Sequence, residues 1–472
     1  GGYADAVIIP NSTAELSEFL RSSYDKGQKV TIAGAGTGNT GGRIPFGGVV
    51  LSTEALDSII SIKKNVQGGY VLTQAGVTVK HLKEEVLKQD LFYPYDPTEQ
   101  TAFIGGTVST NASGARSFKY GSTRQCVSSL QIVLARGDIL NIRRGETFEK
   151  NGYLNFSSDK YCYSIKISDI ISPITNKNSA GYYCKKGMDL IDLFIGHEGT
   201  LGCVTEVGLS VVNKPFGILS CFSFFSKEED ALNFAKSARE LSCINRKTDK
   251  DINALAIEFF DENAMEILKE ADPNISQKAK ACIFFEQDYS EDHEDIIIEK
   301  WIELLNKNNV NEKDIWVAMT EKDRLELIEK RHMIAETMAE YARRSGKPKV
   351  ATDIAVPYDK FKEMYEYYKK IFFEIDIKGI LFGHIGDAHL HMNLLPRTDE
   401  EYELAKSIAM DFIKKAISLG GTVSAEHGIG KMRKTYLKLM YGQNGIDQMI
   451  AVKKSLDPKM ILGVGNIFDI TG

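Results

Sequence analysis

The sequence contains little cysteine, and its cysteines do not cluster. The seven cysteines stand singly at positions 126, 162, 184, 203, 221, 243 and 282, with no CxxC pair and no regular spacing. This pattern argues against a disulfide framework, a thiolate zinc site and an iron–sulfur cluster, because each of these needs grouped cysteines. We therefore expect a protein of a reducing compartment.

Long apolar runs and a strong charge of one sign are also missing. No run approaches the ~20 residues that span a bilayer, and the opening GGYADAV has no charged-then-apolar signal. A net charge of -6 gives no electrostatic reason to expect nucleic acid as a partner. We expect a cytoplasmic protein without membrane spans, or one attached peripherally to a membrane. A lost targeting segment stays open, since the sequence does not begin with Met.

The length of the chain predicts more than one domain. A chain of 472 residues with 43% hydrophobic residues exceeds one ordinary core. Its character changes twice, which predicts domains at 1–213 and 214–420 and a C-terminal segment at 421–472.

Three glycine-rich regions lie in the first domain. GAGTGNTGG (34–42) follows a strand-like stretch, and similar loops occur within 96–140 and 189–212. A Rossmann turn is disfavoured, because Pro45 and a second strand, not a helix, follow the first loop. One such loop could be a plain surface turn, but three favour a single large, elongated ligand held by backbone NH groups.

From Gly217 the pattern alternates between strands and helices with few glycines, which resembles a ferredoxin-like α+β sheet. The expected strands are 217–225, 253–260, 280–287, 314–320, 349–357 and 378–383, and the expected helices are 226–241, 261–271, 292–308, 321–346 and 358–372.

A histidine cluster follows the last of these strands. GHIGDAHLHMN (383–393) places His384 and His391 on either side of a Gly-Asp turn, and His389 shares a strand face with His391. SAEHGIG (424–430) adds the neighbours Glu426 and His427, so four of eight histidines fall in 44 residues.

Imidazole and carboxylate ligands together suit Zn²⁺, Mn²⁺ or Fe²⁺ with positions left open for a substrate oxygen. The competing interpretation is that each histidine is a hydrogen-bonded structural residue.

Five stretches together resemble a known flavoprotein family. They are GAGTGNTGGRIP, DPTEQTAFIGGTVSTNASGARSFKYG, DLFIGHEGTLG, GHIGDAHLHMN and SAEHGIG. The first three are similar to the FAD-binding domain of the vanillyl-alcohol oxidase/PCMH superfamily. The last two are similar to its FAD-linked D-2-hydroxy-acid dehydrogenases, which include D-lactate dehydrogenase, D-2-hydroxyglutarate dehydrogenase and a subunit of glycolate oxidase. The implied fold is α+β, with a PCMH-type FAD-binding domain, a ferredoxin-like substrate (cap) domain and a helical C-terminal segment that returns to the flavin site.

The resemblance implies that the three loops hold FAD. The residues that it places on the cofactor are Gly34, Ala35, Gly36, Thr37, Gly38, Asn39, Thr40, Pro97, Thr98, Gly105, Gly106, Thr110, Asn111, Gly114, Gly121, Glu198, Gly202, Val204 and Asn466. Covalent attachment in the superfamily often uses a histidine of the first loop. That loop has no histidine here, so FAD is expected to be noncovalent.

The resemblance also implies the chemistry. His384, His391 and Glu426 look like the ligands of a divalent metal, Zn²⁺ first with Mn²⁺ or Fe²⁺ as alternatives, and His427 looks like the catalytic base. Hydride would pass from the substrate Cα to flavin N5. Arg331 resembles the clamp of the substrate carboxylate and Asn393 a substrate contact, with a solvated arginine and a plain strand hydrogen bond as the competing interpretations.

The sequence departs from the family pattern at three places. His389 stands where many relatives carry asparagine, His332 follows Arg331 where an acidic residue is usual, and the terminal GVGNIFD lacks the usual proline. D-lactate is favoured over a dicarboxylate such as D-2-hydroxyglutarate, because KVATDIAVP lacks the KYD-type lysine placement associated with the latter. Glycolate stays an alternative substrate.

Two other functions remain open from the sequence. The first is an oxidase of a different alcohol on the same flavin domain, and the second is a noncatalytic flavin subunit that relays electrons. The electron acceptor could be a quinone, a cytochrome, an electron-transfer flavoprotein or oxygen, and a homodimer is the oligomeric state to test.

Overall fold

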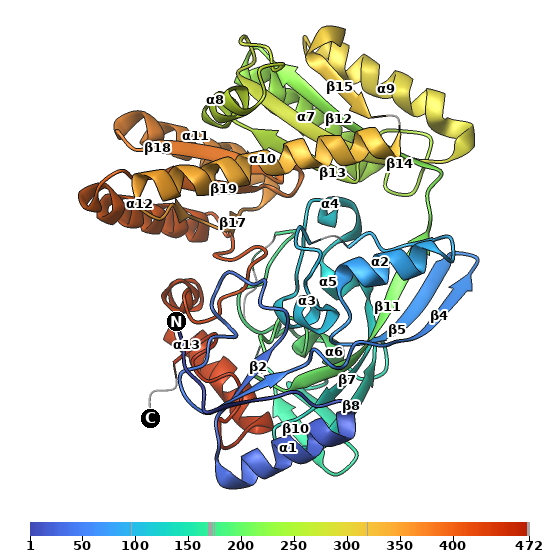
Figure 1. The fold of residues 1–472 in the computed structure, drawn as a ribbon, viewed down its shortest axis with the longest axis vertical. Helices are drawn as coiled ribbons and strands as arrows, with labels where there is room; N and C mark the ends of the chain where they lie inside the picture. The colour runs from blue at the N-terminus through green and yellow to red at the C-terminus, as the bar shows by residue number, and fades with distance from the viewer. Residues whose placement is uncertain (96, 169–172, 174, 319, 470–472) are drawn as a thin grey trace.

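The structure is a computed structural model that describes residues 1–95, 97–168, 173, 175–318 and 320–469. Asp96, at the start of the second glycine-rich region, and Met319, in an expected strand, lie outside the described residues. Figure 1 shows two bodies stacked along the long axis: the N-terminal strands and loops with the C-terminal helix below, and a large sheet with its helices above. Every helix of the described residues is too short or too polar to cross a bilayer.

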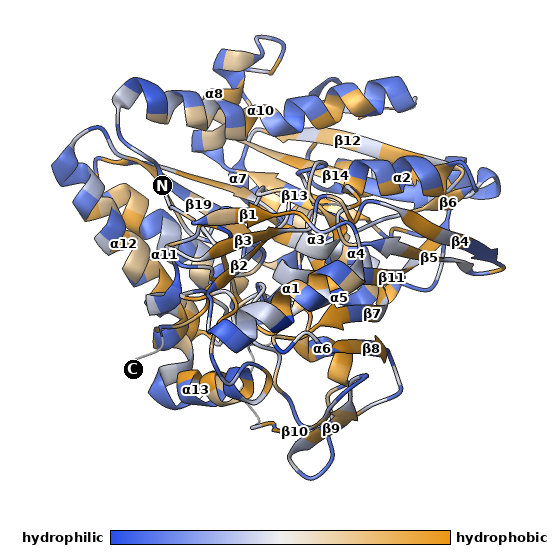
Figure 2. Cartoon of the chain, turned by 60° about the horizontal axis from the view of Figure 1, so that its bottom comes forward, coloured by the Kyte–Doolittle hydropathy of each residue, from blue (hydrophilic) through white to orange (hydrophobic). Residues whose placement is uncertain are grey.

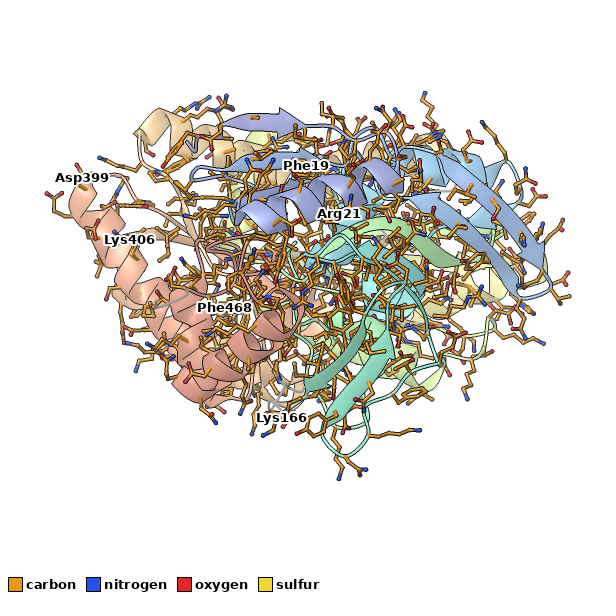
Figure 3. The ribbon with its side chains drawn as sticks, turned by 90° about the horizontal axis from the view of Figure 1, so that it is seen from below. Phe19, Arg21, Lys166, Asp399, Lys406 and Phe468 are labelled. Carbon is orange, nitrogen blue, oxygen red and sulfur yellow. The ribbon has the colours of Figure 1, made fainter. Side chains whose placement is uncertain are left out.

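The lower body holds two sheets. The small one is parallel in the order β1-β3-β2, and the larger one is antiparallel in the order β4-β5-β11-β7-β8, with β6 paired to β11. Their strands are β1 (Ala6–Ile8), β2 (Val30–Ala33), β3 (Val49–Ser52), β4 (Ile59–Asn65), β5 (Gly68–Gln74), β6 (Leu91–Phe92), β7 (Val127–Val133), β8 (Ile139–Arg143) and β11 (Cys203–Asn213). A hairpin of β9 (Tyr153–Ser157) and β10 (Cys162–Lys166) projects beyond them, and Lys166, labelled in Figure 3, lies at the end of the hairpin opposite its turn.

The helices of this body are α1 (Thr13–Lys26), α2 (Val79–Leu87), α3 (Ile104–Thr110), α4 (Ser117–Tyr120), α5 (Thr123–Cys126) and α6 (Leu190–Leu193). The sequence predicts the ends of α1. Ser12 accepts a hydrogen bond from the Glu15 backbone NH as the N-cap, and Gly27 ends the helix in the left-handed region at φ 66°. The helix that a Rossmann turn would require does not follow the first glycine loop, because the chain continues into β3.

The upper body is the predicted ferredoxin-like unit. Its first strands are β12 (Gly217–Phe225), β13 (Ala256–Phe260), β14 (Ala281–Tyr289) and β15 (Ile315–Ala318). They lie antiparallel in the order β15-β12-β14-β13, which is the 4-1-3-2 order expected of that fold. The same sheet continues through β18 (Lys378–Gly383), β19 (His389–Leu395) and β16 (Val350–Ala351), and β17 (Ile354–Ala355) pairs with β19.

Helices cover both faces of this sheet. They are α7 (Glu228–Ile244), α8 (Glu262–Ala271), α9 (Glu294–Lys307), α10 (Glu321–Ser345), α11 (Phe361–Glu374) and α12 (Asp399–Ser418). Apolar residues of α8 and α10 close a small core on one face, while those of α7, α9, α11 and α12 join a core that continues into the lower body. In Figure 2 the helices alternate blue and orange, the pattern of amphipathic surface helices.

The C-terminal segment returns to the lower body. After α13 (Lys434–Leu456), the Ile461 carbonyl accepts a hydrogen bond of 2.8 Å from the Val30 backbone NH. Phe468, which is labelled in Figure 3, is buried and packs against the ring of Tyr182, at 5.9 Å between centroids. The helical C-terminal segment is therefore confirmed, and it is anchored beside the first glycine loop.

A buried ion pair joins the two bodies. Arg116 precedes α4 below, and Glu286 lies on β14 above; their side chains are 5% and 4% exposed and meet at 2.8 Å. Both partners have left water, so they compensate each other's charge, and Arg324 adds a second cation 3.8 Å from Glu286.

We expect Arg116→Ala to lower the free energy of unfolding by about 3–5 kcal/mol, because it leaves Glu286 charged and buried. Urea unfolding measures the change. The double variant Arg116→Met/Glu286→Gln should recover most of the loss, and Lys64→Ala, at an exposed pair, should cost no more than about 1 kcal/mol. Equal losses in R116A and K64A would contradict the assignment.

Candidate active site

A cavity of about 290 Å³ lies where the glycine loops of the lower body meet the C-terminal segment. Of the residues that the sequence assigns to FAD, those that line it are Gly34, Ala35, Gly36, Thr37, Gly38, Asn39, Thr40, Pro97, Thr98, Gly105, Gly106, Thr110, Glu198 and Val204. Glu426 and His427 line the same cavity. All three loops therefore reach one space, as an elongated ligand would require.

The loops suit a flavin dinucleotide because they expose backbone. A Cβ added at Gly38 or Gly106 would point into open space, so a side chain at either position would fill the cavity. Gly106 belongs to the first turn of α3, where the preceding NH groups of Ile104 and Gly105 donate to the Val77 and Ala75 carbonyls.

Five predicted cofactor residues do not line the cavity but support it. Asn111 ends α3 in the left-handed region at φ 49°, and its Oδ1 accepts from Ser122 and Arg124. Gly121 ends α4 at φ 82°, and Gly202 packs against β7 where a Cβ would lie 2.6 Å from Ile132. The remaining two, Gly114 and Asn466, offer hydrogen bonds to buried partners: the Gly114 carbonyl accepts from Lys177, and Asn466 donates to Gly42 and Glu198.

Glu198 fastens the third loop to the C-terminal segment. Its carboxylate accepts hydrogen bonds from the backbone NH groups of Ile429 (2.8 Å) and Gly430 (2.6 Å). Burial raises the pKa of Glu198 to about 7, although these two NH groups oppose the shift.

The predicted histidine turn is present. His384 follows β18, a single 3-10 turn (Ile385–Asp387) reverses the chain, and His389 opens β19. Ring centroids of His384 and His391 lie 5.4 Å apart, and those of His389 and His391 lie 4.6 Å apart. The three imidazoles therefore face one point.

Glu426 completes this cluster. One oxygen, Oε1, lies 3.2 Å from His384 Nε2 and 3.8 Å from His389 Nδ1, and Oε2 lies 3.9 Å from His391 Nε2. One ligand atom from each of the four residues fits within 4.8 Å of the others. Burial lowers the pKa of His389 and His391, which keeps both rings neutral and able to bind a cation.

Asp353, between β16 and β17, holds His427 and His389 in place. The two oxygens lie 3.0 Å from His427 Nδ1 and 3.1 Å from His389 Nε2, and one also accepts from Arg433 at 2.6 Å. Burial alone would raise the pKa of Asp353, but the neighbouring His427 and His389 hold it well below its usual range. Because Gly428 has φ 77° and Gly430 φ 52°, the loop turns so that both Glu426 and His427 line the cavity.

Arg331 does not stand alone in its helix. Its guanidinium pairs with Glu258 of β13 through Nε and, at 2.7 Å, through Nη2, and the same carboxylate lies 2.7 Å from His384 Nδ1. The solvated-arginine interpretation is thus wrong, and the guanidinium fork meets a protein carboxylate.

Asn393, 1% exposed, donates from Nδ2 to the His391 carbonyl, while its buried Oδ1 accepts nothing from the described residues.

Lys177, which the sequence analysis missed, reaches into the cluster from the lower body. Its buried Nζ donates to Glu426 Oε1 at 2.5 Å and to the Gly114 carbonyl at 2.9 Å, and it lies 3.4 Å from Asp387 Oδ2. Asp353 and Glu258 were missed as well. All three lie far in sequence from the residues they contact, so only the fold brings them together.

The metal ligands expected from the sequence thus converge, and the donor set fits a cation. His384 and His389 each present one ring nitrogen to Glu426 while a carboxylate engages the other nitrogen. Outer carboxylates of this kind commonly fix the tautomer of a metal-binding histidine.

A cavity lined by three glycine-rich loops, with Glu426 and His427 beside a cluster of imidazoles, is the arrangement expected of a flavin-dependent oxidoreductase. Comparison with known proteins agrees. Residues 4–143 match the FAD binding domain family, and residues 231–467 match FAD linked oxidases, C-terminal domain. The chain belongs to the FAD-linked oxidases, and the resemblance seen in the sequence is confirmed.

Named relatives align with nearly the whole chain. Glycolate oxidase subunit GlcD of Bacillus subtilis is 31% identical over 98% of this chain and 89% of its own. D-lactate dehydrogenase of Archaeoglobus fulgidus is 28% identical over 98% and 90%. D-2-hydroxyglutarate dehydrogenase of Danio rerio is 26% identical over 98% and 78%. Among solved structures, alkyldihydroxyacetonephosphate synthase shares the fold, with a TM-score of 0.65 and 16% identity over 97% of this chain and 75% of that chain.

We expect the charge of Glu198 to make stability depend on pH. Its folded pKa of about 7 exceeds the ordinary 4.5, so the native state holds the proton more tightly. This contribution, about 3 kcal/mol, is complete below pH ~4.5 and is lost as pH rises through 7. In Glu198→Gln that slope should vanish, leaving a constant loss of about 1–3 kcal/mol for a disturbed hydrogen bond. Urea unfolding between pH 4.5 and 8 measures both, and an unchanged slope in E198Q would rule out Glu198 as the source.

Proposed function

We propose that this protein oxidises a small D-2-hydroxy acid, D-lactate first, to the 2-oxo acid, with noncovalent FAD and a divalent cation, Zn²⁺ first. One observation carries the proposal: Glu426 and His427 line the cavity formed by the three glycine loops, and Glu426 is also part of the imidazole cluster. A substrate bound beside Glu426 and His427 would contact the flavin and the metal ligands together. The names of the relatives, D-lactate dehydrogenase among them, support the substrate class.

The two bound groups would supply the redox and Lewis-acid chemistry. FAD, held by the glycine loops, supplies the acceptor for the hydride that leaves the substrate Cα. A divalent cation, held by His384, His391 and Glu426, would lower the pKa of the substrate hydroxyl.

His427 would take the hydroxyl proton. Its Nδ1 faces Asp353 at 3.0 Å, which fixes the ring tautomer and leaves Nε2 as the basic nitrogen. The Asp353 charge raises the pKa of His427, which strengthens it as a base. Its side chain is 32% exposed, in contrast to the buried histidines, so substrate can reach it.

His389 is proposed as a fourth metal ligand. It is 0% exposed, its Nε2 faces Asp353 and its Nδ1 points toward Glu426. Three imidazoles and one carboxylate suit Zn²⁺, for which nitrogen ligands are favoured.

The charges around the cluster are paired. Glu258 meets Arg331, Asp353 meets Arg433, and Lys177 meets Glu426 and Asp387. A bound divalent cation would add positive charge, which a carboxylate substrate would neutralise. Asn393 has an open acceptor and remains a proposed substrate contact. Arg331 is already paired with Glu258, so it is proposed to act beside the substrate by orienting the Glu258 carboxylate that contacts His384.

Anaerobic flavin spectra test the proposal. With metal supplied, D-lactate should bleach the flavin band of the purified protein, while L-lactate should not. Bleaching by glycolate or D-2-hydroxyglutarate instead would change the substrate within the same reaction. A flavin band that no hydroxy acid bleaches would favour the noncatalytic relay function, and absence of flavin would overturn the proposal.

His427→Gln should slow this bleaching by about 10²- to 10⁴-fold, because the general base is lost. The flavin content and its resting spectrum should stay those of the wild type. An unaffected rate would remove His427 from the reaction and would favour the relay alternative.

Metal content tests the ligand set without reference to activity. His391→Ala and His389→Asn should both reduce the zinc that stays bound after dialysis, because each removes a proposed imidazole ligand. FAD should remain bound when the metal is chelated. The matched control is His293→Asn, at a residue that pairs with Ser290 and Asp249 in the upper body far from the cluster in sequence. Wild-type zinc affinity in H389N would exclude His389 as a ligand.

A further inference from the structure

We propose that Arg43 supplies the positive charge that binds the diphosphate of FAD. This inference rests on the proposed flavin cofactor and assigns a role to a residue that neither the glycine motif nor the sequence analysis singled out. It follows from the charges, the packing and the position of Arg43 at the first loop.

The cavity is lined by more negative than positive side chains, which is unfavourable for a dianionic ligand. Three carboxylates line it: Glu99, Glu198 and Glu426. Among the described lining residues, Arg43 is the only lysine or arginine. Backbone NH groups of the glycine loop provide hydrogen bonds but no net charge. The diphosphate would therefore enter a cavity whose one permanent side-chain cation is Arg43.

Arg43 is packed directly on the loop expected to hold the diphosphate. Its Nη1 donates to the Gly34 carbonyl at 3.1 Å. A Cβ added at Gly36 would lie 2.0 Å from Arg43 Cζ, and Gly36 has φ 83°. The missing side chain of Gly36 thus makes room for the guanidinium, which lies flat against the loop backbone. This explains the glycine at 36 by a contact within the chain as well as by its backbone conformation.

Arg43 also lies where two cavities meet. A second cavity of about 550 Å³ shares Gly34, Ala35, Phe103 and Arg43 with the first. Glu426 and His427, where the reacting end of the flavin is proposed to lie, line the first cavity but not the second. Arg43 lies at the junction of the two cavities, where the diphosphate would lie if an extended dinucleotide passed from one cavity to the other.

Lys431, whose ammonium donates to the cavity residue Gly42, is already engaged. It donates to Asn466 Oδ1 at 2.6 Å and to the Gly42 carbonyl at 3.2 Å, and burial lowers its pKa to about 8. Arg43, by contrast, presents a planar fork that matches phosphate oxygens.

The experiment compares ligands that differ only in phosphate. Arg43→Gln and Arg43→Lys holoenzymes are diluted to measure FAD dissociation by flavin fluorescence, and ADP and riboflavin are used as competitors. R43Q should weaken FAD and ADP by about 10- to 100-fold, while riboflavin binding stays within about 2-fold of the wild type. R43K should recover part of the loss, and the dependence of FAD binding on salt should be shallower in R43Q.

The matched control is Arg21→Gln. Arg21 lies on α1 of the same body, with its side chain 57% exposed at a helix surface (Figure 3), and it lines neither cavity. R21Q removes the same charge and should leave the FAD affinity unchanged.

Two results would overturn the inference. Unchanged FAD affinity in R43Q would show that the diphosphate is held without this charge. Equal weakening of riboflavin and FAD would show that Arg43 only shapes the loop through Gly34. Failure of the proposed function is separate: wild-type protein that binds FAD but is not bleached by any hydroxy acid would leave the Arg43 result standing.

Discussion

The candidate site depends on one buried carboxylate, that of Asp353. It lies at the edge of the upper sheet and accepts from the backbone NH of His427 and from Arg433 of the C-terminal segment. It also faces the rings of His389 and His427. Removing it would leave Arg433 and two imidazoles without their shared acceptor, and would release the loop that carries Glu426. The cap and the C-terminal segment are therefore joined at the point where the chemistry is proposed.

Polar contacts between distant segments also hold the other side of the cavity together. Glu198 accepts from the backbone of the HGIG turn, Asn466 donates to Glu198 and to Gly42, and Lys431 donates to Gly42. Glycine loops have few side chains with which to pack, so their positions must be fixed by polar contacts to other segments. Here those contacts run between loops that are more than 150 residues apart. The cavity can form only when the C-terminal segment has docked, which makes the flavin site a product of the whole fold.

Local signals in the sequence predicted much of the fold. Three predicted features depend on neighbours in the chain, and the structure confirms them. They are the N-cap of helix α1, the strand and helix pattern of the upper body, and the reversal between His384 and His391. Glu426 and His427 are neighbours that would ordinarily point apart, and the positive φ of Gly428, which spacing alone could not show, turns both to the cavity. The contacts of Asp353, Glu258 and Lys177 could not be predicted. Each joins segments that are far apart in the sequence, and the local pattern of residues does not show which distant segments meet. Arg331 is the instructive case: its residue type suggested a carboxylate, and the carboxylate that the structure provides is Glu258.

These missed residues share a physical role. Lys177, Glu258 and Asp353 are buried charges, and a buried charge is costly unless a partner compensates it. Each is paired with a proposed ligand or base, so the pairing that compensates its burial also fixes the geometry of the cluster. Lys177 adds a link between the bodies, because the same ammonium contacts Gly114 of the lower body and Glu426. Glu426 and His427 line the cavity together with Arg43 of the first loop. The proposed metal and its carboxylate substrate belong beside Glu426, and the proposed diphosphate site is at Arg43, so the charged side chains of the chain are matched to two different kinds of bound group.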